Sequence, residues 1–443
     1  MTDDRQVRPA RVAAGPTQAG ETQGRWPWVE ASVWTPRMLA ALEQGVKGGV
    51  WFSLIDKVYA PANLLGAFKR VARNRGAGGV DHVTVEGFGE RRDEHLRDLH
   101  ERLRDGKFRP QAIRRKFIDK PGSKEKRPLG IPTVRDRVVQ GALRQVLEPI
   151  FEKEFAEHSY GFRPGRGCKD ALRRVDGLIK RGYRHTVDVD LKAYFDTIPH
   201  DRLLEKVRKR VIDGRVLGLI EAFLKAEILD GMRSWEPERG APQGAVLSPL
   251  LSNLYLDGLD HLVAGRGYEM TRYADDLVIQ CRTLQEAESA LALVRDWVES
   301  HGLTLHPTKT KVVDVEADGF DFLGYHFEKR YRSPRKKSLE KIRETIRRKT
   351  RRTNGTSLGT IIADVSKTLR GWFEYFKHST SPAFLKLDGW TRMRLRSILR
   401  SRQGRKGCGR GKDHQRWPNA FFTANGFFSL EAARAAIASP RRG

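Results

Sequence analysis

Alternating hydrophobic and polar residues in the middle of the chain predict a small sheet. In residues 185–191, aliphatic side chains alternate with Asp188 and Asp190, a period of two that is typical of a half-buried strand. Residues 270–273 and 277–281 are two further apolar-rich stretches, separated by only Ala-Asp-Asp, and this spacing predicts a hairpin. Helical periodicity lies between these strands. The pattern therefore predicts an α+β domain with helices packed on an antiparallel sheet.

Helical spacing dominates the rest of the chain. Before the sheet, it predicts helices that start at Pro36, at Ala62 and at Asp136, and two short strands over 116–119 and 127–131. Another helix is expected after Pro199. Beyond residue 330 the pattern predicts three helices over 339–351, 358–376 and 382–400. We expect these three to form a small helical bundle.

Charge narrows the class of partner. The 443 residues carry 83 Lys and Arg against 55 Asp and Glu, a net charge of +28, and residues 331–443 alone hold an excess of 21 positive charges. Such an excess favours a polyanionic partner, because neutralising phosphates releases their counterions. Three widely spaced cysteines exclude a disulfide framework and a cysteine-rich zinc module. No apolar run approaches the roughly 18 residues that span a bilayer, so we expect no membrane contact.

Three aspartates are the candidate catalytic residues. Asp190 ends one predicted strand, and Asp275 and Asp276 lie at the hairpin tip, so the sheet can bring them together. Clustered carboxylates repel, and Mg²⁺ relieves this repulsion while leaving positions for phosphate. Two such ions would support an in-line phosphoryl transfer. Adjacent strand residues face opposite ways, so Asp275 is expected as a full ligand and Asp276 in a supporting role. Taken alone, the Asp-Asp pair is more often simple turn chemistry, and Asp190 could be a solvated strand residue.

Ordered motifs add a family resemblance. The sequence Tyr-Ala-Asp-Asp at 273–276 resembles the YxDD box of reverse transcriptases, and its neighbours follow in that family's order. Residues 190–196 resemble the family's first catalytic motif, 243–249 its QGxxxSP motif and 322–325 its primer-grip hairpin. Two upstream segments, 127–137 and 159–164, and one downstream segment, 369–376, are similar to bacterial group II intron proteins. Seven ordered motifs over about residues 35–430 are specific, where YxDD alone would be weak.

The resemblance implies a right-hand polymerase with fingers, a palm containing the antiparallel sheet, and a helical thumb. It implies that Asp190, Asp275 and Asp276 bind two Mg²⁺ ions. Phe195 would exclude the ribose 2′-OH, although it could be an ordinary core aromatic. The other nucleotide-binding residues would be Lys120, Arg127, Gln243 and Gly244, of which the two cations could be solvated turn charges. Lys309, Leu323, Gly324 and Tyr325 would contact primer and template.

The resemblance also assigns the domains. Residues 1–34 are expected to be a flexible tail, 35–115 an N-terminal extension with the start of the fingers, 116–334 the fingers and palm, 335–430 the thumb or maturase domain, and 431–443 a C-terminal tail. Intron RNA would bind the thumb through a set of basic residues. This set is Arg370, Lys377, Arg392, Arg394, Arg396 and Arg400.

The activity implied is an RNA-directed DNA polymerase, using an RNA template, a DNA primer or target and dNTPs, that also assists the splicing and retrohoming of its group II intron RNA. A bacterial cytoplasmic ribonucleoprotein is expected. Cys408 is the last cysteine, so the resemblance is to the branch without a Cys/His-rich endonuclease. Two alternatives remain open: an RNA-binding splicing cofactor with little polymerase activity, and a transcriptase recruited to defence or sequence diversification.

Overall fold

The computed structural model describes residues 26–119, 126–329, 331–380 and 382–438. These divide into two compact units. Unit 1 consists of the described residues up to Asp119 together with Lys126–Gly177 and Val187–Val312, and unit 2 consists of Leu178–Thr186 and the described residues from Val313 onward. The boundary therefore passes through the four-stranded sheet that holds the candidate aspartates.

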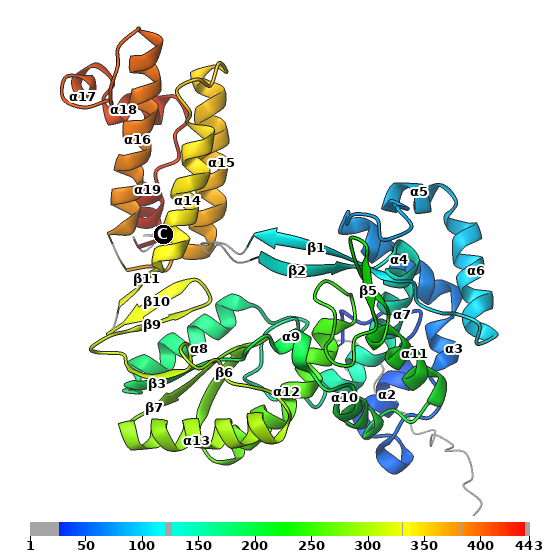
Figure 1. Ribbon diagram of the computed structural model, residues 1–443. Helices are drawn as coiled ribbons and strands as arrows, with labels where there is room; N and C mark the ends of the chain where they lie inside the picture. Colours follow the sequence, from blue (N-terminus) through cyan, green and yellow to red (C-terminus); the bar gives the residue numbers. More distant parts are fainter. Residues whose placement is uncertain (1–25, 120–125, 330, 381, 439–443) are drawn as a thin grey trace, which may run out of the picture. The chain divides into compact units, whose positions relative to one another are not determined.

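That sheet has the strand order β6-β7-β3-β8. Its bounds are β3, His185–Asp190; β6, Glu269–Tyr273; β7, Asp276–Cys281; and β8, Lys311–Asp314. The predicted hairpin is confirmed: β6 and β7 are antiparallel, and their last pair is Tyr273 with Asp276. Helix α12 (Ser248–Gly265) packs against β6, and α13 (Leu284–Ser300) packs against β7 (Figure 1). The predicted α+β class is confirmed.

A second sheet in unit 1 has the order β2-β1-β4-β5. Its strands are β1, Ile113–Asp119; β2, Lys126–Ile131; β4, Ile228–Asp230; and β5, Arg233–Trp235. Strand β1 is antiparallel to β2 and parallel to β4. Helix α7 (Val134–Glu152) follows β2 directly, with Thr133 accepting a hydrogen bond from the Asp136 N–H as its N-cap. Both strands and the helix agree with the sequence prediction.

One continuous hydrophobic core fills unit 1 and includes Trp26, Val33 and Trp34. Trp34 is 2% exposed, and its Nε1–H donates to the carbonyl of Gln145 at 2.9 Å. The predicted flexible tail is therefore wrong for residues 26–34, because these aromatic side chains are packed rather than solvated; residues 1–25 lie outside the described part. The remaining elements of this unit are α2, Pro36–Gln44; η1, Lys47–Gly49; α3, Ile55–Val58; α4, Pro61–Arg73; α5, Val85–Glu90; α6, Arg92–Arg104; α8, Cys168–Lys180; α9, Tyr194–Thr197; α10, His200–Arg208; and α11, Gly214–Leu224.

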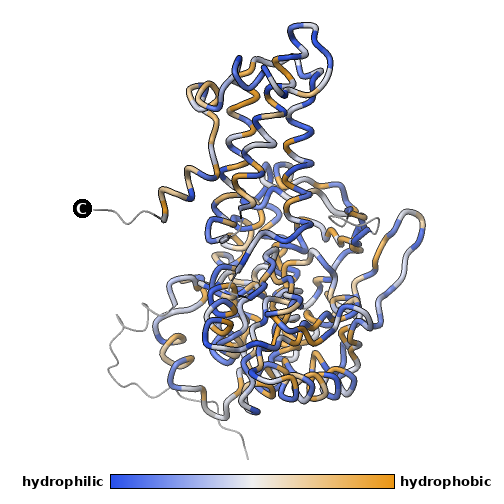
Figure 2. Tube along the Cα trace, turned by 90° about the vertical axis from the view of Figure 1, so that its left-hand side faces the viewer, coloured by the Kyte–Doolittle hydropathy of each residue, from blue (hydrophilic) through white to orange (hydrophobic). Residues whose placement is uncertain are grey.

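Unit 2 contains a three-stranded sheet and a helical bundle. The sheet has the order β11-β10-β9, with β9, Phe320–Phe322; β10, Tyr325–Glu328; and β11, Tyr331–Pro334. The helices are α14, Lys336–Lys349; α15, Leu358–Phe376; α16, Ala383–Arg402; α17, Asp413–Arg416; α18, Asn419–Ala424; and α19, Leu430–Ala438. Figure 2 shows hydrophobic and hydrophilic positions alternating turn by turn along these helices, which agrees with the amphipathic pattern of the sequence.

Two predicted domain boundaries differ from the structure. Residues 313–334 belong to the unit that holds the helices, so the second unit begins before the predicted residue 335. Residues 431–438 were predicted as a tail, but they form α19, which packs against α15 and α16. Within the described ranges, no helix combines the length and the apolar character that crossing a membrane requires.

Candidate active site

The turn that joins β6 to β7 consists of Ala274 and Asp275. Ala274 has φ +57°, a left-handed conformation that costs a residue with a Cβ about 1–2 kcal/mol. It is also buried, with 5% of its surface exposed. A conformation of this kind persists only when the surroundings hold it. The contacts around this turn therefore decide where the Asp275 carboxylate lies.

The segment before α8 supports the turn from one side. Tyr160 N–H donates to the carbonyl of Arg272 at 2.9 Å, and Arg272 N–H donates to the carbonyl of His158 at 3.0 Å. These bonds attach the segment to the edge of β6. A Cβ built on Gly161 would lie 2.2 Å from the Ala274 nitrogen and 2.9 Å from the Tyr273 carbonyl carbon. Only glycine lets the two backbones approach this closely, which explains the glycine in the 159–164 motif.

Asp190 is held at the end of β3 by the loop before β8. Its carbonyl accepts from His306 N–H at 2.7 Å, and its own N–H donates to Thr310 Oγ1 at 3.2 Å. Its Oδ2 lies 2.9 Å from Lys309 Nζ. The predicted primer or template residue Lys309 thus forms an ion pair with a predicted metal ligand.

The Asp190 carboxylate contributes to the electrostatic environment of Asp275. Burial raises the pKa of Asp275, and the neighbouring Asp190 carboxylate raises it further, whereas its backbone N–H and the Arg127 guanidinium lower it. Asp276 is exposed and begins β7. The expected cluster of three carboxylates is not formed: among the residues that the structure describes, no group of three His, Cys, Asp or Glu side chains is arranged to hold a metal ion.

The donors nevertheless fit a divalent cation at two of the three positions. Two half-buried carboxylates whose charges repel are stabilised by a hard cation with oxygen ligands. The Lys309 ammonium provides positive charge at Asp190, and Arg127 provides it toward Asp275. A metal ion would be held by Asp190 and Asp275, with Asp276 at the start of the next strand.

The predicted nucleotide-binding residues of β2 and of the 243–249 motif lie together. Gly130 N–H donates to the carbonyl of Gln243 at 2.7 Å. Gly244 has φ +104°, and a Cβ there would lie 2.5 Å from the Gly130 carbonyl oxygen. The motif therefore needs glycine at this position, for both conformation and space. Arg127 is exposed on the same strand β2. Lys120 lies outside the described residues.

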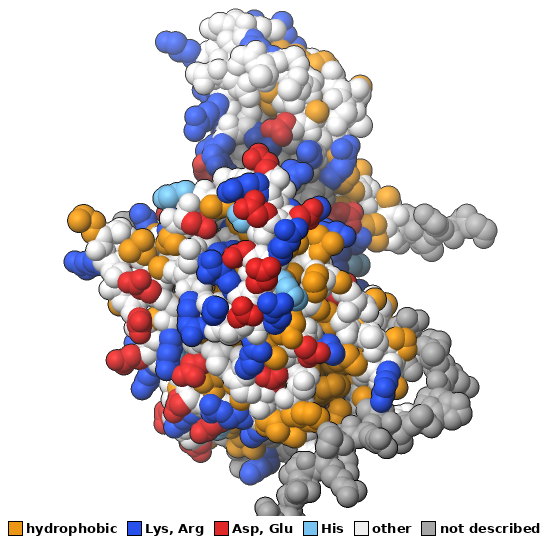
Figure 3. All heavy atoms as spheres, turned by 90° about the vertical axis from the view of Figure 1, so that its right-hand side faces the viewer, with side chains coloured by type: hydrophobic (Ala, Val, Ile, Leu, Met, Phe, Trp, Pro, Cys, Tyr) orange, Lys and Arg blue, Asp and Glu red, His pale blue; other side chains and the backbone are white. Residues whose placement is uncertain are grey.

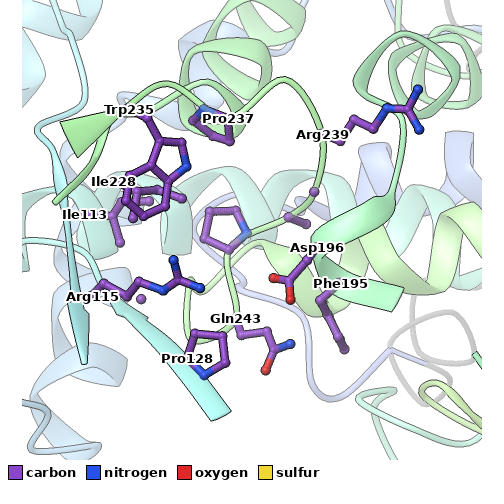
Figure 4. Close-up of a pocket in the computed structure, with 14 residues that line it drawn as sticks. Ile113, Arg115, Pro128, Phe195, Asp196, Ile228, Trp235, Pro237, Arg239 and Gln243 are labelled. Atoms are coloured by element: carbon purple, nitrogen blue, oxygen red, sulfur yellow. The ribbon is translucent and has the colours of Figure 1, made fainter. Parts of the chain in front are cut away.

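Phe195 and Gln243 line a pocket of about 270 Å³ in unit 1. Figure 4 shows Arg115 and Asp196 directed toward each other across this cavity, with Trp235 above them. Burial raises the pKa of Asp196, and Arg115 lowers it. The Arg115 guanidinium lies 5.1 Å from the Phe117 ring centroid and 5.3 Å from that of Trp235, within cation–π range.

Sequence reasoning missed Arg115, Asp196 and Trp235 in this pocket. A signal for Arg115 was present, because it alternates with Phe117 along a strand and so shares a face with an aromatic ring. Asp196 directly follows Phe195 within a recognised motif. Trp235 carries no such signal, since only the β4–β5 hairpin brings it to β1.

The predicted primer-grip residues lie in unit 2, in the turn between β9 and β10. Leu323 and Gly324 have positive φ values of 45° and 86°. The Tyr375 hydroxyl donates to the carbonyl of Leu323 at 2.7 Å, and the Tyr325 hydroxyl donates to the carbonyl of Tyr375 at 2.6 Å. Tyr325 is 3% exposed. Its predicted contact with primer or template is therefore corrected: the ring packs inside unit 2 and fixes the turn.

The predicted RNA-binding arginines separate into two groups. Arg392 and Arg396 are 9% and 1% exposed, so their prediction as RNA contacts is wrong. Arg396 donates to the carbonyl of Trp417 at 2.9 Å and to Asn419 Oδ1 at 2.8 Å, which ties α16 to α17 and α18. Arg394 and Arg400 are half-buried and bonded within the bundle.

Arg394 donates to Thr350 Oγ1 at 2.6 Å, and Arg400 pairs with Asp413 at 2.9 Å. Arg370 is exposed, and its guanidinium lies 5.3 Å from the Phe428 ring centroid. Lys377 pairs with Glu374 at 2.9 Å. Arg370 thus remains the most accessible of the six predicted RNA contacts.

Comparisons with known proteins identify the families that the chain resembles. Residues 118–327 match the family described as reverse transcriptase (RNA-dependent DNA polymerase), and residues 339–417 match the group II intron, maturase-specific domain. The chain is 41% identical over 202 residues to the group II intron-encoded protein LtrA of Lactococcus lactis subsp. cremoris, a match covering 44% of this chain and 33% of LtrA. The chain therefore spans about a third of the length of that relative.

Two further similarities extend the comparison. Protein YkfC of Escherichia coli (strain K12) is 35% identical over 287 residues, covering 56% of this chain and 74% of YkfC. A chain of a solved partial Cas6-RT-Cas1–Cas2 complex covers 56% of this chain at 24% identity, with a TM-score of 0.37.

Proposed function

We propose that this chain, which belongs to the reverse transcriptases that carry a group II intron maturase-specific domain, is an RNA-directed DNA polymerase that also binds its intron RNA. Its substrates would be dNTPs, an RNA template and a DNA primer or target. The observation that carries this proposal is the Asp275 carboxylate in the β6–β7 turn, which is under the electrostatic influence of both Asp190 and Arg127. Binding intron RNA while extending a nicked target would support splicing and retrohoming.

The side chains divide the work of the reaction. Arg127 would neutralise triphosphate charge, as an arginine does best with its fixed fork of donors. Phe195 would exclude the ribose 2′-OH, and Gln243 and Gly244 would contact the nucleotide and template. Leu323 and Gly324 would contact the primer. Lys309 would balance the charge of the Asp190 carboxylate through their ion pair.

Members of this family use divalent metal ions. We infer Mg²⁺, two ions, from the hard oxygen donors of Asp190 and Asp275. When bound, they would stabilise the attacking and leaving oxygens of phosphoryl transfer. The raised pKa of Asp275 means that protons compete with the metal at lower pH.

Primer extension on an RNA template tests the polymerase. We expect Asp275→Asn to lose at least about 1,000-fold in rate, because the negative charge that would bind the metal is gone. Asp296→Asn, which changes an exposed aspartate on α13, is the matched control and should extend primers at the wild-type rate. Undiminished extension by Asp275→Asn would contradict the assignment of the site.

The maturase-specific match to residues 339–417 favours an intron role over defence or diversification. We propose that RNA binds exposed cations of unit 2, because the buried arginines of α16 are committed to the fold. The exposed cations include Arg370 on α15 and, on α14, Lys336, Lys337, Lys341, Arg347 and Arg348. Elsewhere the surface is more balanced: Figure 3 shows acidic and basic side chains intermixed on one face.

Salt dependence of RNA binding tests this surface. Replacing Lys337, Lys341 and Arg348 with Gln should reduce the slope of log affinity against log salt by about 2–3, close to one for each phosphate that is no longer neutralised. Replacing exposed Arg92, Arg97 and Arg104 of α6, a helix of similar length in unit 1, is not expected to change it. An unchanged slope in the α14 variant would place the RNA site elsewhere.

A further inference from the structure

An arginine with no exposed surface lies on β6, two residues before the first residue of the turn that carries Asp275. Arg272 is 0% exposed. Its Nε–H group lies 2.7 Å from Asp260 Oδ1 and 3.0 Å from Oδ2, and its Nη2 also donates to Oδ2. Asp260 lies on α12 and is 3% exposed. A buried charge is costly unless it is paired, and a buried ion pair often stabilises no better than packed hydrophobic residues would. Stability alone therefore does not explain why this pair is present.

The remaining guanidinium nitrogen of Arg272, Nη1, contacts the turn. Arg272 Nη1 donates to the carbonyl of Ala274 and to Asn253 Oδ1, both at 2.9 Å. Asn253, 1% exposed and also on α12, donates from Nδ2 to the carbonyl of Gly161 at 2.7 Å. One helix thus holds both backbone segments that meet at the turn, one directly through Asn253 and one through Arg272.

The atom that Arg272 holds determines the direction of Asp275. The Ala274 carbonyl and the Asp275 nitrogen belong to one planar peptide group, so a bond to that oxygen fixes the plane from which the Asp275 side chain departs. Ala274 needs such a restraint, because its left-handed conformation is unfavourable for alanine. The ladder pair of Tyr273 and Asp276 closes the hairpin but leaves this peptide group outside the ladder.

We propose that Arg272, Asp260 and Asn253 are positioning residues: they hold the peptide group between Ala274 and Asp275, and so set the Asp275 carboxylate against Asp190. Arg272 holds the Ala274 carbonyl, and Asp260 orients and neutralises the Arg272 guanidinium. Asn253 connects that guanidinium to the neighbouring Gly161 backbone. The catalytic consequence rests on the proposed polymerase function, whereas the ordering of the turn does not.

The decisive variant removes the ion pair without leaving a buried charge. In the double variant Arg272→Met with Asp260→Leu, both partners become apolar, so no buried charge is left unpaired, and the loss of stability should be limited to about 2–3 kcal/mol from the acceptors that Arg272 no longer reaches. The Ala274 carbonyl and Asn253 nevertheless lose their donor. We expect the single-turnover rate of primer extension to fall about 100-fold, as a misplacement of about 1 Å can cause, while the apparent affinity for dNTP changes less than about threefold. A folded double variant that extends primers at the wild-type rate would show that the ion pair has a purely structural role, and would overturn the proposal.

Two further measurements keep the test independent of activity and of folding failure. Amide hydrogen exchange of residues 273–276 should be at least about tenfold faster in the double variant, because the turn then opens locally; unchanged exchange would overturn the proposal even if wild-type protein extended no primer. If the double variant does not fold, Asn253→Ala should show the same faster exchange and a slower extension rate. Glu269→Gln is the matched control. It breaks an ion pair with Arg174 at the other end of β6 and should leave exchange at the turn unchanged.

Discussion

Adding a single methyl group to Gly161 tests whether backbone proximity controls the candidate active site. The Cβ of Gly161→Ala would lie 2.2 Å from the Ala274 nitrogen and 3.0 Å from the Ala274 Cα. Gly161 is not among the residues with positive φ, so alanine is compatible with its own backbone conformation. The substitution therefore acts almost purely by pushing one segment away from the turn that carries Asp275.

The size of the effect follows from the distances. Ordinary contact begins at 3.4 Å, so the Ala274 backbone has to move by about 1 Å or more. Forcing an extra methyl group into a packed site costs about 1–3 kcal/mol of stability. The effect on catalysis is larger, because misplacing a reacting group by about 1 Å can reduce a rate about 100-fold. We expect a folded protein that synthesises DNA about 100-fold more slowly.

Single-turnover primer extension and thermal unfolding, measured on the same preparations, separate the two effects. Gly177→Ala is the matched control: it adds the same methyl group on α8, where nothing lies within 4 Å of the new Cβ, and it should extend primers at the wild-type rate. Intron RNA binding through unit 2 should be unchanged in both variants. A folded Gly161→Ala protein with the wild-type extension rate would refute the reasoning that this contact positions Asp275.

Three further predictions concern other parts of the chain. Burial raises the pKa of Asp136 to about 6; the folded state thus favours the protonated carboxyl, so the stability from this group is present below about pH 4 and is lost as the pH rises through 6. In thermal unfolding between pH 4.5 and 7, Asp136→Asn should remove a pH-dependent difference of about 2 kcal/mol, and identical profiles would contradict the shift. Arg396→Met should lower the unfolding free energy by about 2–3 kcal/mol by leaving its acceptors unpaired, without changing the salt slope of RNA binding; a reduced slope in a folded protein would restore Arg396 as an RNA contact. Phe195→Val should increase the ratio of rNTP to dNTP extension at least about tenfold, because removing the ring removes a steric penalty of about 1.4 kcal/mol or more against the ribose 2′-OH. An unchanged ratio would mean that Phe195 has only a packing role.

Local pattern was sufficient for the elements around the site. The period of two over 185–191 and the short spacing before 277–281 led directly to β3 and to the β6–β7 hairpin. Helix α15 was predicted with its observed bounds, Leu358–Phe376, because its apolar stripe is regular and Ser357 caps its first turn. Both kinds of signal act within a few residues, so they can be read without knowing the tertiary structure.

Long-range packing accounts for what was missed. The arginine run in α16 has the composition of a solvated face, but residues 409–419 return to cover part of it, and Arg396 bonds to Trp417 and Asn419. Trp34 ends a stretch, residues 26–34, that contains three tryptophans and two valines, but its partner Gln145 is 111 residues away. No periodicity within α16 or within residues 26–34 could reveal a partner that distant contacts supply.

The same reasoning explains why the candidate site depends on residues that carry no chemistry of their own. Asp275 lies in a two-residue turn whose first residue is conformationally strained, so the turn has little rigidity from its own sequence. Restraints reach it from the Tyr273–Asp276 ladder pair, from the Gly161 backbone and from Arg272. Because these contacts determine the direction of one carboxylate, substitutions that touch neither nucleotide nor metal should change the rate of synthesis more than they change stability. Variants in the exposed α14 cations should show the opposite separation, weakening RNA binding while leaving extension of a short primer–template intact.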